Sequence, residues 1–515
     1  MNRIPRVLQK PLFALLILVL LFGSSLAQGR LNVKREELGL TRVTPLENAP
    51  PMLAFTTVAL GGFRGLLADA LWSRLQDLQL EGKFFEMVQL SDWITKLYPT
   101  FSDVWVHLAW NMSYNISVKF EAMEEKWRWV RRGIEMLRDE GLKYNPNSVD
   151  IYRELAWHYQ HKLGMAMDDA NRYYKTVLAR EMNEVFPGGD ANAEPLVNPQ
   201  TPEDEARRER IVEDFKLDPE TLLFVDTEYG PLDWRLPEAH AVYWGTAGLQ
   251  KIEEGLLFDP VTYERIKREE FIKLRRTVYQ SMQLAFRRGR IVVDLGELLE
   301  NPNYFIDTGP NLDIAEATNR AYESMMEEDD EYREHISTGH ENMLRDAVYY
   351  FFTHNRLPEA TRWFKYLLEK YPDSIEPGQD IESYAISRVA DVVGGMSRDR
   401  IRLALEGFFE NAFYSWAIGD EDQAASYEVF ARKVYENYQA KTTDTASSER
   451  RIAFRKTYAQ LREEALIRNV NPQTSVLPPE MILRLRTALE LPADFGLEES
   501  DPEDSQEALQ PVGAL

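Results

Sequence analysis

Residues 71–99 read LWSRLQDLQLEGKFFEMVQLSDWITKLYP, and this stretch decides the fold. Apolar residues recur at helical spacing on both sides of Gly82, which predicts two amphipathic helices. Gly82 can adopt the left-handed conformation that ends the first helix, and Pro99 cannot continue the second one. Because neither helix can bury its apolar stripe alone, the stretch predicts an antiparallel helix pair that packs against further pairs.

The same unit recurs along the chain. The patterns WVHLA at residues 105–109 and YRELA at residues 152–156 each follow a proline and begin with an aromatic residue. Much later, residues 355–372 have the same turn-to-proline length as residues 82–99. These patterns resemble tetratricopeptide repeats (TPRs), and the resemblance covers about half of the chain in two blocks.

The resemblance implies an all-α fold in which antiparallel helix pairs stack as a TPR-like superhelical array. In such folds the first helix of each pair lines a concave surface that holds a partner. GGFRGLLADALW at residues 61–72, DWITKLYPTF at 92–101 and AWNMSYNIS at 109–117 also resemble a group of TPR-like proteins of the bacterial cell envelope that have no established activity.

The N-terminus has the features of an export signal. Arg3, Arg6 and Lys10 precede an uninterrupted apolar run of 11 residues at positions 12–22, and Ser25-Leu26-Ala27 offers a small-x-small cleavage site. The run is short for a spanning helix, which needs about 20 apolar residues. We therefore expect an exported, periplasmic protein whose signal peptide is cleaved before Gln28, with an uncleaved inner-membrane anchor as the alternative.

Composition shifts divide the rest of the chain. Prolines, glycines and acidic residues mark the loops, and apolar periodicity marks the helical blocks. The predicted segments are 1–27, signal peptide or membrane anchor; 28–51, linker; 52–186, N-terminal TPR-like block; 187–240, inserted loop region; 241–340, helical connecting region; 341–491, C-terminal TPR-like block; and 492–515, acidic disordered tail.

Charge and motif content exclude several classes of function. The formal net charge of −24 argues against a nucleic-acid binder, because phosphate attraction needs a basic face. The absence of cysteine excludes disulfides, thiolate metal sites and cysteine nucleophiles. The sequence has no HExxH, no Walker-type loop and no GxSxG. It therefore predicts no catalytic residues, no metal and no cofactor.

Four residues are candidates for holding a partner. Asn111 and Asn115 are four residues apart beside Trp110, and amides on a concave surface can donate and accept hydrogen bonds at once. The alternative is that the two amides are buried between helices. Arg64 lies in the second apolar patch, where it either faces a membrane or protein partner or forms an internal pair with Asp69.

Three functions remain open. The first is a non-enzymatic scaffold of the cell envelope that binds another protein or an extended peptide segment in a TPR-type groove, with membrane contact only through the N-terminal segment. The second is an envelope enzyme or glycan-binding protein that uses region 187–240, with Asp226, Asp233 and His240 as its polar groups. The third is a purely structural envelope component, because a helical-repeat fold alone does not select a function.

Overall fold

The computed structural model describes most of the chain between residues 63 and 496. The described residues are 63–189, 191–258, 260–292, 295–302, 305–328, 330, 332–354, 356–375, 378–381, 384–385, 398–443, 454–472, 474–475, 477–492 and 495–496, with short helical stretches between 20 and 34. The predicted signal peptide, linker and acidic tail therefore lie largely outside the described residues. Within the described part, no helix is both long and apolar enough to cross a bilayer.

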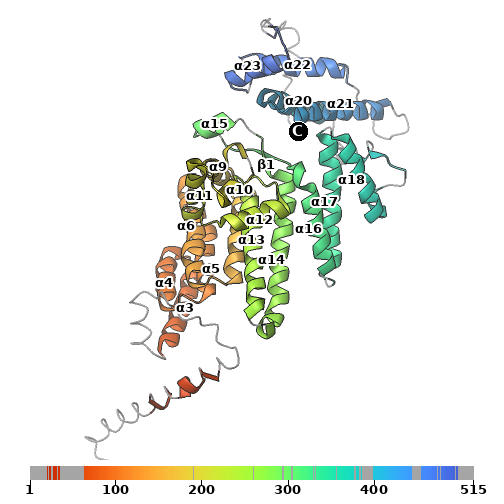
Figure 1. The fold of residues 1–515 in the computed structure, drawn as a ribbon. Helices are drawn as coiled ribbons and strands as arrows, with labels where there is room; N and C mark the ends of the chain where they lie inside the picture. The colour runs from red at the N-terminus through yellow and green to blue at the C-terminus, as the bar shows by residue number, and fades with distance from the viewer. Residues whose placement is uncertain are drawn as a thin grey trace, which may run out of the picture. The chain divides into compact units, whose positions relative to one another are not determined.

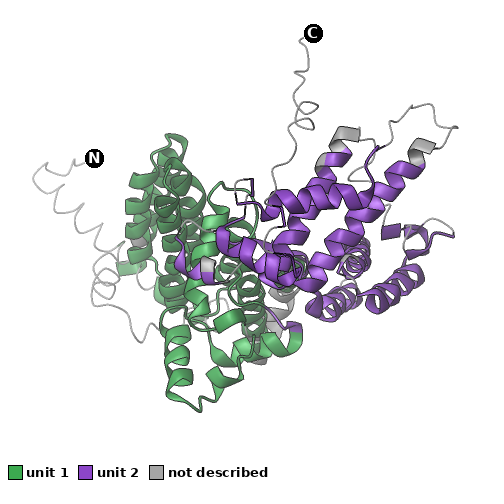
Figure 2. Ribbon diagram, turned by 90° about the horizontal axis from the view of Figure 1, so that it is seen from above, with its two compact units in different colours: residues 1–228, 233–282 green, residues 229–232, 283–515 purple. Residues whose placement is uncertain are grey.

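The prediction of an all-α fold is confirmed. Helices make up nearly all of the regular structure, and the described strands are β1 (Arg290–Ile291) and β2 (Thr308–Gly309), which pair antiparallel (Figure 1). The chain divides into two compact units, shown in different colours in Figure 2. Unit 1 comprises Met1–Glu228 and Asp233–Met282, and unit 2 comprises Tyr229–Leu232 and Gln283–Leu515.

The helices of unit 1 follow one another with short connections. In chain order they are α3 (Phe63–Leu80), α4 (Phe84–Leu97), α5 (Ser102–Trp110), η1 (Asn111–Ile116), η2 (Ser117–Lys119), α6 (Met123–Glu135), η3 (Met136–Gly141), α7 (Leu142–Tyr144), α8 (Val149–Trp157), η4 (His158–Leu163), α9 (Asn171–Asn183), η5 (Pro187–Gly189), α10 (Glu194–Val197), α11 (Pro202–Glu213), α12 (Pro219–Tyr229), α13 (Pro237–Phe258) and α14 (Pro260–Arg288).

The first helix pair is built as the sequence predicts. Gly82 has a φ of 71°, so it occupies the left-handed turn between α3 and α4. Leu75 of α3 and Met87 and Ile94 of α4 are buried in one shared cluster. Helix α4 ends at Leu97, before the proline that cannot continue it.

Two glycines give a matched test of this turn. Gly82→Ala should cost about 1 kcal/mol of unfolding free energy, because an L-residue resists positive φ. Gly407→Ala should instead stabilise by about 0.5–1 kcal/mol, since this glycine is inside helix α20 (Arg398–Ile418) and a Cβ there meets no atom within 4 Å. Urea denaturation measures both changes. Effects of the same sign would contradict the placement of Gly82 in a left-handed turn and of Gly407 inside a helix.

Helices α5 and α8, each with the π-helical segment that continues it, form an internal repeat of 47 residues. Helix α5 with η1 spans residues 102–116, and helix α8 with η4 spans residues 149–163, so each boundary of the second helix lies 47 residues after that of the first. Trp105 Nε1 donates to the Pro99 carbonyl at 2.8 Å, and Tyr152 OH donates to the Pro146 carbonyl at 3.1 Å. The two aromatic residues therefore fasten the same turn in both copies.

Three π-helical segments lengthen α5, α6 and α8. Segments η1, η3 and η4 each continue an α-helix with the wider i→i+5 hydrogen-bond pattern, which is rare and often found at functional sites. The wider turns rotate the side chains that follow relative to an ordinary helix. The 47-residue period also exceeds the 34 residues typical of TPRs, and the TPR resemblance itself stays a prediction.

Region 187–240, expected as an inserted loop, is largely helical. It contains η5, α10, α11, α12 and the start of α13. Helix α11 begins with a reciprocal cap: Thr201 Oγ1 accepts from the Asp204 N–H at 3.1 Å, and the Asp204 carboxylate accepts from the Thr201 N–H at 3.1 Å. Such reciprocal caps let short, charged helices form where composition alone suggests a loop.

Unit 2 repeats the geometry of the first pair. Its further helices are α15 (Leu295–Glu300), η6 (Leu312–Ile314), α16 (Ala315–Glu328), α17 (Arg333–Thr353), α18 (Leu357–Lys370), η7 (Pro372–Ser374), α20, α21 (Glu421–Thr443), α22 (Tyr458–Val470) and α23 (Pro479–Ala488). Helices α18 and α4 both have 14 residues, and their C-caps Tyr371 and Tyr98 have φ of −136° and −135°. Each cap precedes a proline, as the turn-to-proline pattern predicts.

Candidate functional site

A band of aromatic and imidazole rings runs across three helices of unit 1. We call it the aromatic band, and it consists of Trp72, His107, Trp110, Tyr114, Trp157 and His161. Helix α3 supplies the first residue, α5 and η1 supply the next three, and α8 and η4 supply the last two. In the TPR resemblance these are the first helices of successive pairs, the ones expected to face a partner.

Ring contacts join Trp72 to His107 on one side of the band and link its other four residues to one another. Trp110 stacks on Tyr114 with centroids 5.7 Å apart, and Trp157 stacks on His161 with centroids 4.4 Å apart. Tyr114 OH lies 3.1 Å from His161 Nδ1, which joins the two stacked pairs. Trp110 and Trp157 are each 37 % exposed, so part of each residue is open to solvent while its ring is stacked on a neighbour.

The band repeats with the 47-residue period. Trp110 and Trp157 occupy equivalent positions in the two copies, and Tyr114 is equivalent to His161. The sequence carries a signal for this, since Leu-Ala-Trp occurs at 108–110 and again at 155–157. The predicted partner-binding residues included Trp110 but neither Trp157 nor His161.

The four predicted partner-binding residues have different environments. Asn111 is fully buried, and Asn115 Nδ2 donates to its Oδ1 at 3.0 Å. Asn111 Nδ2 has no hydrogen-bond partner among the described residues. Asn111 therefore offers nothing to a surface ligand, whereas Asn115 is half-buried and Trp110 is partly exposed. Arg64 belongs to α3, but its side chain is outside the described part of the structure.

A serine, a histidine and a glutamate meet beneath the band. Ser113 Oγ lies 3.0 Å from His158 Nε2, while His158 Nδ1 lies 2.8 Å from the Glu154 carbonyl oxygen and 3.3 Å from Glu154 Oε1. These are the residue types of a hydrolytic triad, which also needs an accessible nucleophile. Ser113 and His158 are fully buried, and a Cβ built on Gly133 would lie 2.4 Å from Ser113 Oγ. In this structure the trio joins helices and reaches no substrate.

A buried charge cluster anchors the end of η4. Lys162 Nζ lies 2.6 Å from Asp168 Oδ2, and Tyr174 OH donates to the same oxygen at 3.0 Å. Burial acts to raise the pKa of Asp168, but the Lys162 ammonium and the Ala170 N–H outweigh it and hold that pKa well below its usual range. Lys162 Nζ also lies 5.2 Å from the centre of the Tyr114 ring, so the cluster supports the band.

The polar groups of the alternative site serve the fold. Trp234 Nε1 donates to the Asp226 carboxylate at 3.0 Å, and Asp233 pairs with Arg235 at 2.8 Å. His240 is fully buried, with Nε2 2.9 Å from the Trp234 carbonyl, and burial lowers its pKa to about 4. Asp226 of α12, Asp233 of the connection that follows and His240 of α13 are thus each bonded to a group of the protein itself.

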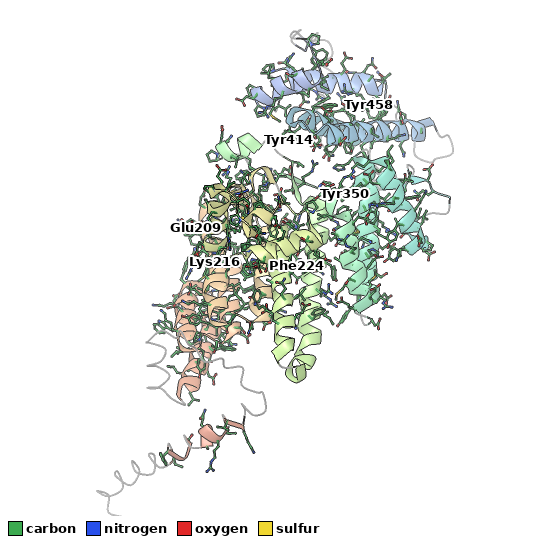
Figure 3. All side chains as sticks on the ribbon, in the orientation of Figure 1. Glu209, Lys216, Phe224, Tyr350, Tyr414 and Tyr458 are labelled. Atoms are coloured by element: carbon green, nitrogen blue, oxygen red, sulfur yellow. The ribbon has the colours of Figure 1, made fainter. Side chains whose placement is uncertain are left out.

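Two clefts of unit 1 are lined by mixed charges. The larger, of about 780 Å³, lies beside α12 and α13 and includes Lys216, which Figure 3 labels, together with Asp218 and Trp244. The smaller, of about 440 Å³, lies beside α6, α9 and α11. Both include Arg138, and neither includes a residue of the aromatic band. Among the described residues, no group of three or more His, Asp or Glu is arranged to hold a metal ion.

No family model matches the chain, and neither a curated protein nor a solved structure matches it. Of the features of unit 1, the aromatic band combines partial exposure, rigid ring stacking and repetition along the array. These are properties of surfaces that hold another molecule by ring contacts.

Proposed function

We propose that this chain is a non-enzymatic scaffold of the bacterial cell envelope that binds an extended segment of a partner protein along the aromatic band. The observation that carries the proposal is the pair Trp110 and Trp157, which are equally exposed at equivalent positions of two repeats. Tryptophan is enriched among the residues that contribute most to binding energy, and a ring already fixed by stacking loses little conformational freedom on binding.

An extended segment suits the band better than a compact ligand. The two tryptophans come from successive repeats, so a chain laid across them meets the same kind of contact twice. Tyr114, His161 and Asn115 add groups that can donate or accept hydrogen bonds, which a peptide backbone offers along its whole length. The net charge of −24 favours a neutral or basic partner.

The envelope location rests on the N-terminal sequence. The positive residues, the short apolar run and the small-x-small site support export, with an inner-membrane anchor as the other possible outcome of the same segment. The alternative enzyme or glycan-binding site at 187–240 has less support, because Asp226, Asp233 and His240 are each bonded to other groups of the protein.

Removing both indoles should abolish most partner binding. Peptides selected from a displayed random library against the wild-type chain should bind Trp110→Ala/Trp157→Ala at least about tenfold more weakly, because each truncation removes an aromatic anchor. Calorimetry on the selected peptides measures the affinity. Thermal melting checks that the variant is folded, since both rings also make packing contacts.

Phe224→Ala is the matched control, because Phe224 is 46 % exposed on α12, is labelled in Figure 3, and is not part of the band. It should leave peptide affinity unchanged. If the library yields no binder, or if the selected peptides bind the double variant as tightly as the wild type, the scaffold proposal fails and a purely structural role takes its place.

A further inference from the structure

Unit 2 contains a small cavity whose lining includes several aromatic rings. It encloses about 210 Å³ next to α17, α20, α21 and the β1–β2 ribbon. Figure 3 labels two of its residues, Tyr350 of α17 and Tyr414 of α20. Its aromatic lining residues are Tyr349, Tyr350, Phe408, Tyr414, Tyr427 and Phe430. No role in the scaffold proposed above involves this cavity.

The rings around the cavity are inclined to one another. Tyr349 meets Tyr350 at 64° and Phe430 at 79°, with centroids 5.4 and 5.8 Å apart, and Phe408 meets Phe430 at 49°. Rings in a closed apolar core could pack in this way too, but here they border a space that is open to a ligand. Walls of this kind present both π-faces and ring edges to whatever occupies the space.

The charged groups of the lining are acidic. Asp307 and Asp420 line the cavity, and no lysine or arginine does. Asp420 pairs with Arg290 at 2.9 Å, which neutralises it. Asp307 is exposed, and its Oδ1 accepts from the Thr308 N–H at 2.8 Å. The lining histidine, His354, has its Nδ1 2.8 Å from the Tyr350 carbonyl, and burial lowers its pKa, so it adds no positive charge at neutral pH.

We propose that this cavity binds a small organic ammonium group. Tyrosine and phenylalanine rings attract cations through their π-faces, most strongly where water is excluded, and Asp307 supplies the opposite charge. The lining has no lysine or arginine to pair with an anion, and the neighbouring Arg290 is already paired with Asp420. The volume is below the roughly 300–1,000 Å³ of drug-sized pockets, so the ligand is small. It is either a free amine or the end of a lysine side chain.

Choline and its neutral carbon analogue, 3,3-dimethylbutan-1-ol, separate charge recognition from apolar filling. Calorimetry with the full-length chain should show saturable choline binding and at least about tenfold weaker binding of the alcohol. Methylammonium is measured alongside as a smaller cation. Nα-acetyl-lysine methylamide distinguishes the two sources, because preference for it over choline and methylammonium would identify a protein side chain as the ligand.

Two substitutions of exposed aspartates locate the charge. Asp307→Asn should weaken binding of the preferred cation about tenfold and leave binding of the alcohol unchanged. Asp373→Asn is the matched control, since Asp373 is exposed in the same unit and does not line the cavity. The proposal is overturned if no cation binds, if the alcohol binds as tightly as choline, or if Asp307→Asn leaves cation affinity intact.

Discussion

Replacing Lys162 by methionine is expected to lower the free energy of unfolding by about 3–5 kcal/mol. The side chains of Lys162 and Asp168 are only 5 % and 4 % exposed, and methionine matches the lysine stem without its charge. The change leaves the Asp168 carboxylate buried, with Lys126 Nζ, 4.0 Å from its other oxygen, as the nearest described cation. Removing one partner of a buried pair is costly because the remaining charge has lost its solvation and its counter-charge.

The chain contains a matched control for this substitution. Lys96 and Asp92 form a pair of the same 2.6 Å length, but their side chains are 68 % and 49 % exposed. Lys96→Met should therefore cost no more than about 1 kcal/mol. Urea denaturation of both variants gives the comparison. Similar losses for the two substitutions would show that burial does not determine the strength of the Lys162 pair.

Local sequence signals predicted the helix pairs because glycine and proline restrict or free the backbone at their own positions. Gly82 was recognised by its freedom to take positive φ, and Pro99 by its inability to continue a helix, and both hold in the structure. Trp105, the aromatic residue that begins the pattern at 105–109, is 3 % exposed. The turn-to-proline pattern at 355–372 likewise corresponds to a second pair with the backbone geometry of the first.

The candidate site was harder to predict because the three π-helical segments depend on tertiary packing. Applying the ordinary 3.6-residue period beyond Trp110 puts Asn111 and Asn115 on one face that could point outward. In the structure η1 begins at Asn111, and that amide is fully buried while Trp110 and Tyr114 contribute to the band. The copy at Trp157 was visible in the sequence only by aligning the two Leu-Ala-Trp segments.

Region 187–240 was predicted to be a loop but is largely helical. Its prolines, glycines and acidic residues predicted a loop, but caps and pairs such as Thr201 with Asp204 and Asp233 with Arg235 stabilise short helices and turns there. Both bonds join residues two or three positions apart, so they act within a short stretch of backbone. The same polar groups that suggested chemistry, Asp226 and His240 among them, serve in the same way as internal partners.

Two buried histidines should make the protein lose stability in mild acid. His240 in unit 1 and His340 in unit 2 are fully buried, and burial lowers the pKa of each from 6.5 to about 4. Between these values the unfolded chain binds a proton that the folded chain does not. Stability is therefore complete above pH 6.5 and falls as the pH drops toward 4, by about 2 kcal/mol per histidine at pH 5.

His340 is the better one to test because both of its ring nitrogens have a hydrogen-bond partner. Its Nε2 lies 2.6 Å from Asn319 Oδ1 and its Nδ1 lies 2.8 Å from Tyr371 OH. Glu323 acts to raise its pKa and Lys370 to lower it, but burial dominates. Glutamine can keep a donor and an acceptor at this position and cannot titrate, so His340→Gln should remove about 2 kcal/mol of the loss between pH 7 and pH 5.

Native-state hydrogen exchange of the α17 amides, corrected for the intrinsic exchange rate at each pH, measures the local stability of this unit. His335→Gln is the control, because His335 is exposed on the same helix, and its pH profile should match that of the wild type. If His340→Gln keeps the full acid loss, protonation of His340 is not its cause. Carboxylates with lowered pKa values, such as Asp168, act only at still lower pH, since their stabilisation is lost below their unfolded value near 4.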